Sequence, residues 1–344
     1  LGPNAQGKTN VLEAIHVLAL ARSHRTSNDR ELIAWNQDSA RVKGEVERRH
    51  GGVTLELELT PRGKKAKVGG IEQRRLSDFV GRLNVVLFAP EDLDIVKGPP
   101  VVRRRFMDME IGQTHPGYLH DLVQFHRVLE HRNRFLKTAD PGRTASGELN
   151  VWNEQLALYG VRMMRRRERF IRKIRPLAGE IHAGVSRSAE TLTVEYKPSF
   201  GTAEQVAGED DSSLIEKFML MLTESQEQEF RRGVTLIGPH RDDVRLLIDG
   251  RDAQSFGSQG QQRTAALSLK LAELELVREE IGEYPLLLLD DVLSELDPAR
   301  QAQLVEAFRS RVQTFITTTS LDGLDLKRLE DAVVFHVRQG RIFT

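Results

Sequence analysis

The spacing of apolar and polar positions changes character twice along the chain and predicts its organisation. Residues 10–21 carry apolar side chains at helical spacing, directly after a glycine-containing loop. Residues 40–48 and 53–59 alternate as antiparallel strands do, with a turn at residues 50–52. A short apolar strand is expected over residues 84–88. The first third of the chain is therefore expected to combine helix and sheet.

The middle of the chain has a different pattern. From about residue 103 to residue 189 the spacing is that of long, charged, amphipathic helices, with a break at residues 138–142. Residues 191–197 have the pattern of a strand, whereas the polar and acidic residues 201–213 are predicted to be a loop or linker. The pattern indicates a helical insertion.

The last third returns to an alternation of strands and helices. Residues 285–290 are an apolar run of the kind found in buried parallel strands, and residues 314–318 are expected to form another. Residues 333–337 and 341–343 flank a glycine-containing turn at residues 339–340 and are expected to form a hairpin.

These patterns together predict one α/β head whose sequence is split by a helical domain. The expected bounds are residues 1–106 for the first part of the head, 107–190 for the insertion and 191–344 for the second part of the head. A phosphate-binding loop normally follows a buried strand, yet here the loop begins directly after Leu1. We therefore expect the sequence to be a fragment that lacks an N-terminal strand or hairpin.

Composition narrows the class of protein. The 344 residues contain no cysteine, which excludes disulfides and Cys-ligated metal sites and fits a reducing cytoplasmic location. No run of about eighteen apolar residues exists, so no membrane-spanning helix is expected. The 50 basic and 50 acidic residues balance, so any nucleic-acid-binding surface must come from local clustering.

Residues 2–9 form a complete Walker A pattern. Backbone N–H groups and the N-terminus of the following helix can hold phosphates, Lys8 can reach the β- and γ-phosphates, and Thr9 can bind Mg²⁺. The alternative, a glycine-rich turn with a surface lysine, is disfavoured by the helix that follows. The predicted nucleotide-binding residues here are Gly2, Pro3, Asn4, Ala5, Gln6, Gly7, Lys8, Thr9 and Asn10.

A Walker B pattern ends the apolar run. Asp290 follows four leucines and can share a Mg²⁺ ion with Thr9, and Asp291 can orient or polarise the attacking water. We assign Asp290 and Asp291 as the catalytic pair. The alternative, two exposed turn acids after a buried strand, is disfavoured by the Walker A pattern.

Residues 258–263, Ser-Gln-Gly-Gln-Gln-Arg, resemble the signature of ATP-binding-cassette (ABC) ATPases, with Gly257 at its leucine position and Gln259 at its first glycine. The resemblance implies that Ser258, Gly260 and Gln261 contact the γ-phosphate bound to the other subunit. Without the two Walker patterns the segment could equally be a helix N-cap with a polar first turn.

Two further segments bear on the ABC resemblance. Residues 294–297 match the D-loop of those ATPases. Residues 317–319 are threonines at the place where most of them carry a switch histidine. This departure leaves the γ-phosphate sensor open and suggests slow hydrolysis.

Other stretches resemble the RecF family in particular, namely residues 22–25, 88–93, 97–99, 103–108 and 238–243. The resemblance covers essentially the whole chain. It implies an ATP- and Mg²⁺-dependent homodimer that binds single-stranded and duplex DNA at gap junctions and works with RecR and RecO to load RecA. For residues 238–243 we prefer a place near the nucleotide or the dimer interface, and the alternative is a loop braced by local ion pairs.

Two basic clusters are candidates for DNA contact. One, at an expected hairpin tip, contains Arg62, Lys64, Lys65 and Lys67, followed by Arg74 and Arg75. The other gives one predicted helix a basic surface made of Arg162, Arg165, Arg166, Arg167, Arg169, Arg172, Lys173 and Arg175. Such clusters suit sequence-independent phosphate contacts. The alternative is a solvated face whose cations pair with acids such as Glu154 and Glu168.

Two other classes of protein share the ATPase motifs. A nucleotide-binding subunit of a membrane transporter usually has the switch histidine and lacks so long a helical insertion. An SMC-like chromosome protein would need hundreds of residues of heptads between the two halves of the head. Membrane co-purification or binding to gapped DNA would discriminate among these classes.

Overall fold

In a computed structural model, the chain is described over residues 1–49, 51–138, 146–295, 300–301, 304–306, 311–320 and 332–343. It forms two compact units, one of residues 1–93 with 267–344 and the other of residues 94–266. These units divide the chain at different residues from the domain bounds expected from the sequence, and those bounds stay a prediction.

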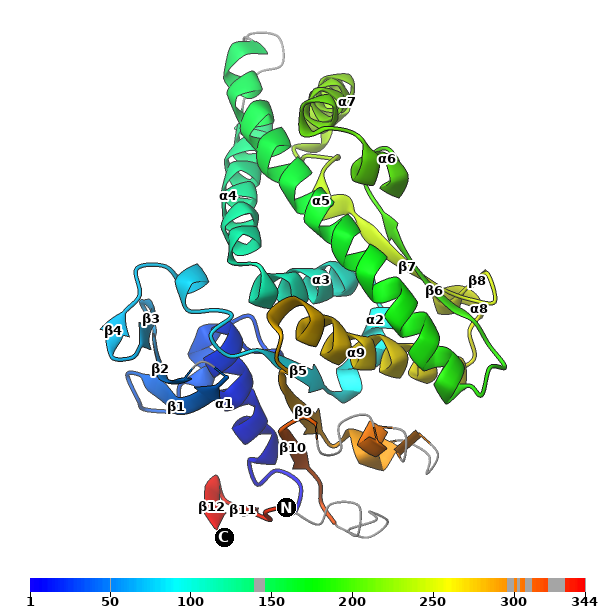
Figure 1. Cartoon of the computed structure of the whole chain (residues 1–344). Helices are drawn as coiled ribbons and strands as arrows, with labels where there is room; N and C mark the ends of the chain where they lie inside the picture. The colour runs from blue at the N-terminus through cyan, green and yellow to red at the C-terminus, as the bar shows by residue number, and fades with distance from the viewer. Residues whose placement is uncertain are drawn as a thin grey trace. The chain divides into compact units, whose positions relative to one another are not determined.

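The first unit is built on a three-stranded parallel sheet (Figure 1). Strand β9 (Leu286–Asp290) lies in the middle and pairs in parallel with β5 (Val85–Phe88) and β10 (Thr314–Thr317). Leu287, Leu288 and Leu289 of β9 are buried, so both faces of the strand are covered, which explains its unbroken apolar sequence. Helix α1 (Lys8–Leu20) packs against all three strands. The predicted helix and all three predicted strands are confirmed.

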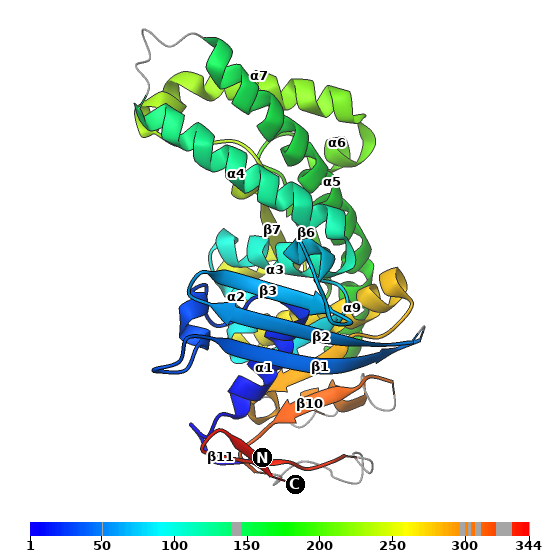
Figure 2. The same ribbon diagram turned by 90° about the vertical axis from the view of Figure 1, so that its left-hand side faces the viewer.

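A second sheet of the same unit is an antiparallel meander, whose strands lie side by side in Figure 2. It contains β1 (Ala40–Arg48), β2 (Gly51–Thr60), β3 (Gly63–Val68) and β4 (Ile71–Glu72). Leu55, Leu57 and Leu59 bury one face, and charged residues alternate with them. The alternating pattern therefore predicted both the strands and their antiparallel pairing correctly.

A hairpin of β11 (His336–Arg338) and β12 (Arg341–Phe343) ends the first unit. The prediction is confirmed, although the first strand begins three residues later than expected. Short 3₁₀ helices connect the larger elements of the unit, namely η1 (Asp29–Leu32), η2 (Leu76–Asp78), η3 (Pro90–Asp92) and η5 (Val292–Glu295).

The second unit begins within α2 (Leu93–Lys97) and continues with the helices α3 (Pro100–Thr114), α4 (Pro116–Thr138) and α5 (Ser146–Val185). Helices α4 and α5 lie side by side (Figure 1). The helical insertion predicted from the sequence is thus confirmed in character. Pro116 separates α3 from α4, because a proline disfavours helical backbone at the residue before it. The break expected at residues 138–142 lies, from residue 139 on, outside the described residues.

The loop predicted over residues 201–213 is wrong. Helix α6 (Ala203–Gly208) and the start of α7 (Asp211–Arg232) occupy it. Thr202 and Gln205 form a capping box at the start of α6, and the Asp210 carboxylate accepts the Ser213 N–H at the start of α7. Both helices therefore begin with side-chain caps, and the polar residues read as a loop are helix starts.

A three-stranded antiparallel sheet completes the second unit. Its order is β6 (Leu192–Lys197), β7 (Asp243–Ile248) and β8 (Arg251–Asp252). The 3₁₀ helix η4 (Pro239–Arg241) precedes β7. After β8 come α8 (Ala253–Phe256) and α9 (Gln259–Ile281), within which the division between the two units falls. Within the described ranges, every helix is too short or too polar to cross a membrane.

Candidate nucleotide-binding site

The Walker A loop joins Leu1 to the start of α1 and is shaped by left-handed backbone. Gly7 has φ 100° and Ala5 has φ 62°, and Gly7 is the N-cap of α1. The first turn of α1, residues 8–11, contains no acid. The helix N-terminus therefore keeps its positive partial charge for an anion, as a phosphate-binding loop requires.

Lys8 is the buried cation of this loop. Its Nζ donates hydrogen bonds to the carbonyl oxygens of Gly2 (2.6 Å) and Pro3 (3.0 Å), and the residue is 8% exposed. The ammonium is thus held over its own loop by neutral acceptors. An incoming phosphate can replace these carbonyls with stronger, charge-assisted hydrogen bonds.

The start of α1 and the end of β9 meet through Thr9 and Asp290. The Thr9 hydroxyl donates to Oδ1 of Asp290 at 3.0 Å, although the two residues are 281 positions apart in the sequence. A hydroxyl and a carboxylate side by side are oxygen ligands of the kind that Mg²⁺ takes together with phosphates and waters. The predicted pair fits a Mg²⁺ ion. No cluster of three or more His, Cys, Asp or Glu side chains able to hold a metal occurs among the described residues.

Thr317 is a site residue that the sequence reasoning did not assign. Its hydroxyl donates to Asp290 Oδ1 at 2.7 Å and accepts the backbone N–H of Asp291 at 3.1 Å. The signal in the sequence is a polar residue at the end of an apolar strand. Because β10 runs parallel to β9, Thr317 at the end of β10 is in register with Asp290. One of the threonines at the switch-histidine position therefore binds both predicted catalytic acids.

Residues 22–25, seen in the sequence only as a family marker, lie against the polar side of α1. The Ser23 hydroxyl donates to Glu13 at 2.5 Å. The guanidinium of Arg25 contacts Glu13 and Asn10, each at 3.4 Å. Asn10, one of the predicted nucleotide-binding residues, thus contacts the 22–25 segment.

The C-terminal hairpin supports the Walker A loop from a distant part of the sequence. The Gln6 carbonyl accepts the N–H of Gly340 and its side-chain oxygen accepts the N–H of Gln339, both at 2.9 Å. A Cβ at Gly2 would lie 2.4 Å from the Val337 carbonyl oxygen, so only glycine fits there. The side-chain oxygen of Gln6, a predicted nucleotide-binding residue, is thus bound to the hairpin turn.

The predicted signature residues Ser258, Gly260 and Gln261 lie at the start of α9, in the second unit. The Ser258 hydroxyl accepts the N–H of Gln261 at 3.2 Å, and the Gln261 side-chain oxygen accepts the N–H of Ser258 at 2.8 Å. This reciprocal pair is a capping box. Ser258 is exposed, so the cap leaves one side of the hydroxyl accessible. Of the predicted D-loop, residues 296–297 lie outside the described residues.

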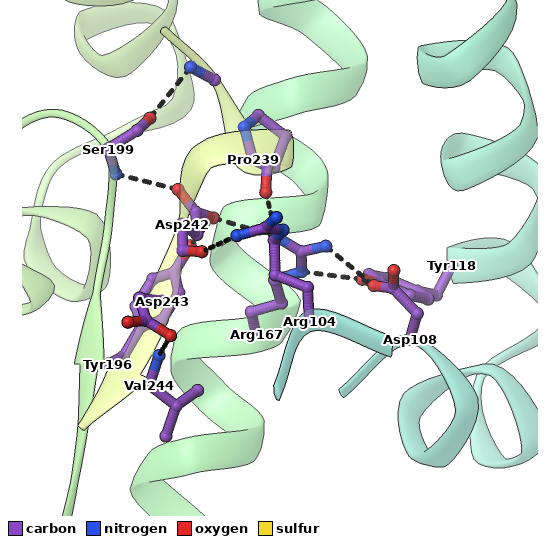
Figure 3. Close-up of polar contacts among 11 residues, drawn as sticks. Arg104, Asp108, Tyr118, Arg167, Tyr196, Ser199, Pro239, Asp242, Asp243 and Val244 are labelled. Carbon is purple, nitrogen blue, oxygen red and sulfur yellow. Dashed lines mark hydrogen bonds and ion pairs between the residues drawn. The ribbon is translucent and has the colours of Figure 1, made fainter. Parts of the chain in front are cut away.

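Residues 238–243 are part of a buried polar cluster, drawn in Figure 3. Asp242 accepts hydrogen bonds from the Arg167 guanidinium (3.1 Å), the Ser199 N–H (2.8 Å) and the Tyr196 hydroxyl. Arg167 also donates to the carbonyl of Pro239 at 2.6 Å. The geometry shows a loop braced by buried polar contacts, and a role near the nucleotide or dimer interface stays a prediction.

His240 of the same segment is neutral. Burial lowers its pKa to about 4, so at neutral pH its Nε2 donates to the Thr235 carbonyl oxygen, 3.0 Å away. Its ring lies 5.8 Å from that of Phe125. The histidine therefore fills the interior of the second unit and supplies no positive charge.

The basic hairpin is largely neutralised by acids. Lys64 donates to the Ala21 carbonyl at 2.6 Å and pairs with Asp29 at 2.8 Å, and Lys67 pairs with Glu56 at 3.3 Å. Lys65 stands opposite Glu58 in the β2–β3 register. Arg62 in the turn is exposed, so only part of the predicted cluster is accessible to a phosphate backbone.

The basic surface predicted on α5 is also divided. Arg165 pairs with Asp211 at 2.9 Å and donates to the Val206 carbonyl at 2.7 Å, and Arg166 pairs with Asp121. Arg167 is buried, whereas Arg169 is exposed. The predicted alternative, cations paired with acids, describes Arg165 and Arg166, whereas Arg169 stays an accessible candidate for DNA contact.

Comparison with known proteins finds a family match that covers nearly the whole chain. The family described as "RecF/RecN/SMC N terminal domain" matches residues 1–341. Two curated relatives, each called DNA replication and repair protein RecF, come from Lysinibacillus sphaericus and Bacillus subtilis. They are 52% and 50% identical to the chain, each match covering 99% of it and 92% of the relative.

Solved structures give the same result. The chain is similar to a structure described as the recombination mediator protein RecF-ATPrS in the RecFOR pathway, with a TM-score of 0.90 and 34% identity over 99% of this chain and 90% of the other. An Smc head domain from Pyrococcus furiosus, 15% identical with a TM-score of 0.50 over 99% of this chain and 87% of the other, shares the fold. The predicted fold, an ABC-type ATPase head with a helical insertion, is confirmed.

Proposed function

Since the chain belongs to the RecF family, we propose that it is an ATP-dependent DNA-binding protein of DNA replication and repair that hydrolyses ATP slowly. The observation that carries the proposal is the hydrogen bond between Thr9 and Asp290, which unites the Walker A and Walker B residues. The similarity to a RecF–ATP structure, at a TM-score of 0.90, supports ATP as the nucleotide.

Some residues of the site bind ATP and its metal ion, and others position the groups that react. The N-terminus of α1 and Lys8 bind the β- and γ-phosphates, and Thr9 with Asp290 would hold Mg²⁺, which neutralises charge that develops on the phosphates. Asp291 orients the attacking water. Thr317 supports this arrangement, since its hydroxyl donates to the Asp290 carboxylate and accepts the backbone N–H of Asp291.

The proposal extends to an ATP-dependent homodimer in which Ser258 of one copy caps the γ-phosphate held by the other. We further propose single-stranded and duplex DNA at gap junctions as the nucleic-acid partner, with Arg62, Lys65 and Arg169 as its accessible cations. RecR, RecO and RecA are the expected protein partners. The RecFOR pathway named for a similar structure supports this extension. A transporter subunit is disfavoured by the family match over residues 1–341.

Replacement of Asp291 by Asn should slow ATP hydrolysis while ATP binding persists. Asp291 has φ 55°, and Asn tolerates left-handed backbone as well as Asp does, so the turn is retained. The substitution removes the carboxylate that orients water but leaves Asp290 to the metal. Single-turnover phosphate release should fall by about a hundredfold or more, and ATP-bound dimer should accumulate.

The matched control for this substitution is Asp290→Asn. It should weaken Mg²⁺-dependent nucleotide binding itself, because it alters the carboxylate that Thr9 and Thr317 contact. If Asp291→Asn hydrolyses ATP at the wild-type rate, another residue orients the attacking water.

Replacement of Ser258 by Arg should prevent ATP-induced dimerisation and leave the ATP affinity of the monomer within about twofold. A bulky cation would stand where the partner's phosphate must approach, whereas the Walker A loop belongs to the other unit of the chain. Light scattering with a non-hydrolysable ATP analogue, together with retention on gapped DNA, measures both effects. Ser212→Arg, at another exposed serine of the second unit, is the control. A Ser258→Arg protein that dimerises normally would make Ser258 a helix cap only and contradict the proposed dimer.

A further inference from the structure

The signature cap has a third member, which comes from outside the signature. While the Gln261 side-chain oxygen accepts the Ser258 N–H, its Nε2 donates to Oε1 of Glu190 at 2.9 Å. Both ends of this carboxamide are therefore occupied, one by the signature and one by Glu190. A carboxamide held at both ends has one orientation, and that orientation fixes the capping box.

Glu190 is itself held in place. Its second carboxylate oxygen lies 3.4 Å from Nε2 of His182, a fully buried residue in the last turn of α5. The turn between α5 and Glu190 contains two left-handed residues that are not glycine, Arg187 (φ 55°) and Ser188 (φ 60°). Such residues are uncommon outside glycine and indicate a turn whose path is fixed by its surroundings.

The other side of Glu190 is anchored as well. Thr191 donates from both its backbone N–H and its hydroxyl to Oδ1 of Asp249, each at 2.9 Å, which ties the start of β6 to the end of β7. The Ser186 hydroxyl donates to the Glu190 carbonyl at 3.4 Å. The carboxylate thus stands on a rigid corner of the second unit, as a residue that positions another side chain must.

We propose that Glu190 is a positioning residue for the signature: by holding the Gln261 carboxamide it presents Ser258 and the first N–H groups of α9 to the partner's γ-phosphate in a single arrangement. This inference rests on the proposed ATP-dependent dimer. Through Glu190, the end of α5, a helix of 40 residues, sets the geometry of the signature.

The first test compares ATP affinity with ATP-induced dimerisation in the full chain. Glu190→Ala should raise the concentration of non-hydrolysable ATP analogue needed for half-maximal dimerisation by roughly tenfold, the effect of losing one charge-assisted hydrogen bond. Binding of a fluorescent ATP analogue to the dilute monomer should stay within about twofold of wild type. Glu190→Gln keeps an oxygen that can accept from Gln261 and should restore most of the dimerisation. The control is Glu195→Ala, which removes a carboxylate of the neighbouring strand that pairs with Lys197.

A reversed pair makes the test specific to this contact. Gln261→Glu alone places a second carboxylate against Glu190 and should abolish ATP-induced dimerisation. When Gln261→Glu is combined with Glu190→Gln, the side chain at position 190 can donate a hydrogen bond and the carboxylate at position 261 can accept it. The carboxylate at position 261 can also still accept the Ser258 N–H. The double variant should therefore dimerise at a lower analogue concentration than Gln261→Glu alone, which a general loss of folding would not allow.

The outcomes separate this inference from the proposed function. If Glu190→Ala dimerises like the wild type while Ser258→Arg does not dimerise, the inference is overturned and the proposed dimer stands. Equal losses of monomer ATP affinity and dimerisation, or a reversed pair as defective as Gln261→Glu, would also overturn it, since both indicate a purely structural role. Normal dimerisation by Ser258→Arg would overturn the proposed dimer and, with it, the site that Glu190 positions.

Discussion

Replacement of Lys8 by Ala should weaken ATP binding by at least roughly a hundredfold. The loss follows from the charge-assisted hydrogen bonds that the ammonium makes to the β- and γ-phosphates, each contributing about 1.5–3 kcal/mol. The buried position of Lys8, with Nζ 2.6 Å from the Gly2 carbonyl, shows that the ammonium is already directed into the loop. Titration of a fluorescent ATP analogue measures the effect.

The control for Lys8→Ala must remove a lysine of the same unit that lies away from the loop. Lys43 is suitable, because it is exposed on β1 and stands opposite Glu56 in the β1–β2 register. Lys43→Ala should bind ATP like wild type. Both variants should be compared by thermal unfolding, since Lys8 also braces Gly2 and Pro3. Undiminished ATP affinity in a folded Lys8→Ala protein would refute the Walker A assignment.

Local sequence sufficed for the parts of the site that local chemistry determines. The Walker A loop requires glycines at fixed places and a helix after it, so the sequence predicted the loop and α1 together. The unbroken leucines of β9 indicated burial on both faces, and the parallel sheet confirms this. Asp290 and Asp291 then followed from their position at the end of that strand.

Contacts between distant segments could not be predicted in the same way. The hydrogen bonds from Gly340 to Gln6 and from Gln261 to Glu190 depend on how separate elements pack, and nothing in either local sequence specifies them. The misassigned loop has a different cause. Thr202 and Asp210 are good helix caps, and their spacing indicates two helix starts. The acidic composition between them favours a loop instead, and that prediction is wrong.

The arginines of α5 show how helical spacing could have refined the basic surface. Met164, Ile171 and Ile174 form a buried stripe, and Arg167 lies within it at the same three- and four-residue spacing. A cation on an apolar stripe indicates a buried ion pair, whereas Arg169 lies off the stripe and is exposed. A single basic surface made of all the α5 arginines would therefore combine the buried Arg167 with exposed residues such as Arg169.

Replacement of Arg167 by Met should destabilise the second unit by about 3–5 kcal/mol, because it leaves buried carboxylates without their counter-charge. Arg167 donates to Asp242 at 3.1 Å, to Asp108 at 2.8 Å and to the Tyr118 hydroxyl at 2.9 Å, as Figure 3 shows. Burial raises the pKa of Asp242, and Arg167 opposes that shift. Methionine has the length of the arginine stem but offers no donor.

The measurement can be confined to the second unit. The chain has two tryptophans, Trp35 in the first unit and Trp152 on α5, whose ring stacks on His131 at 5.3 Å. In a Trp35→Phe background, the fluorescence of Trp152 during urea unfolding reports the second unit. Arg169→Met is the matched control, the same substitution two residues along the same helix at an exposed position, and it should change the unfolding free energy by less than about 0.5 kcal/mol.

A double variant decides whether the cost arises from charge or from shape. Asp242→Asn removes the carboxylate that Arg167 faces. It keeps an oxygen that can accept from the Ser199 N–H, and its amide nitrogen can donate to the Tyr196 hydroxyl oxygen. If unpaired charge is the main cost of Arg167→Met, adding Asp242→Asn should recover at least about 1 kcal/mol, because one of the two stranded carboxylates is gone. Strict additivity of the two substitutions would show that packing around the arginine stem, and not the ion pair, stabilises this cluster. A loss below about 1 kcal/mol for Arg167→Met itself would contradict the buried cluster as the centre of the second unit.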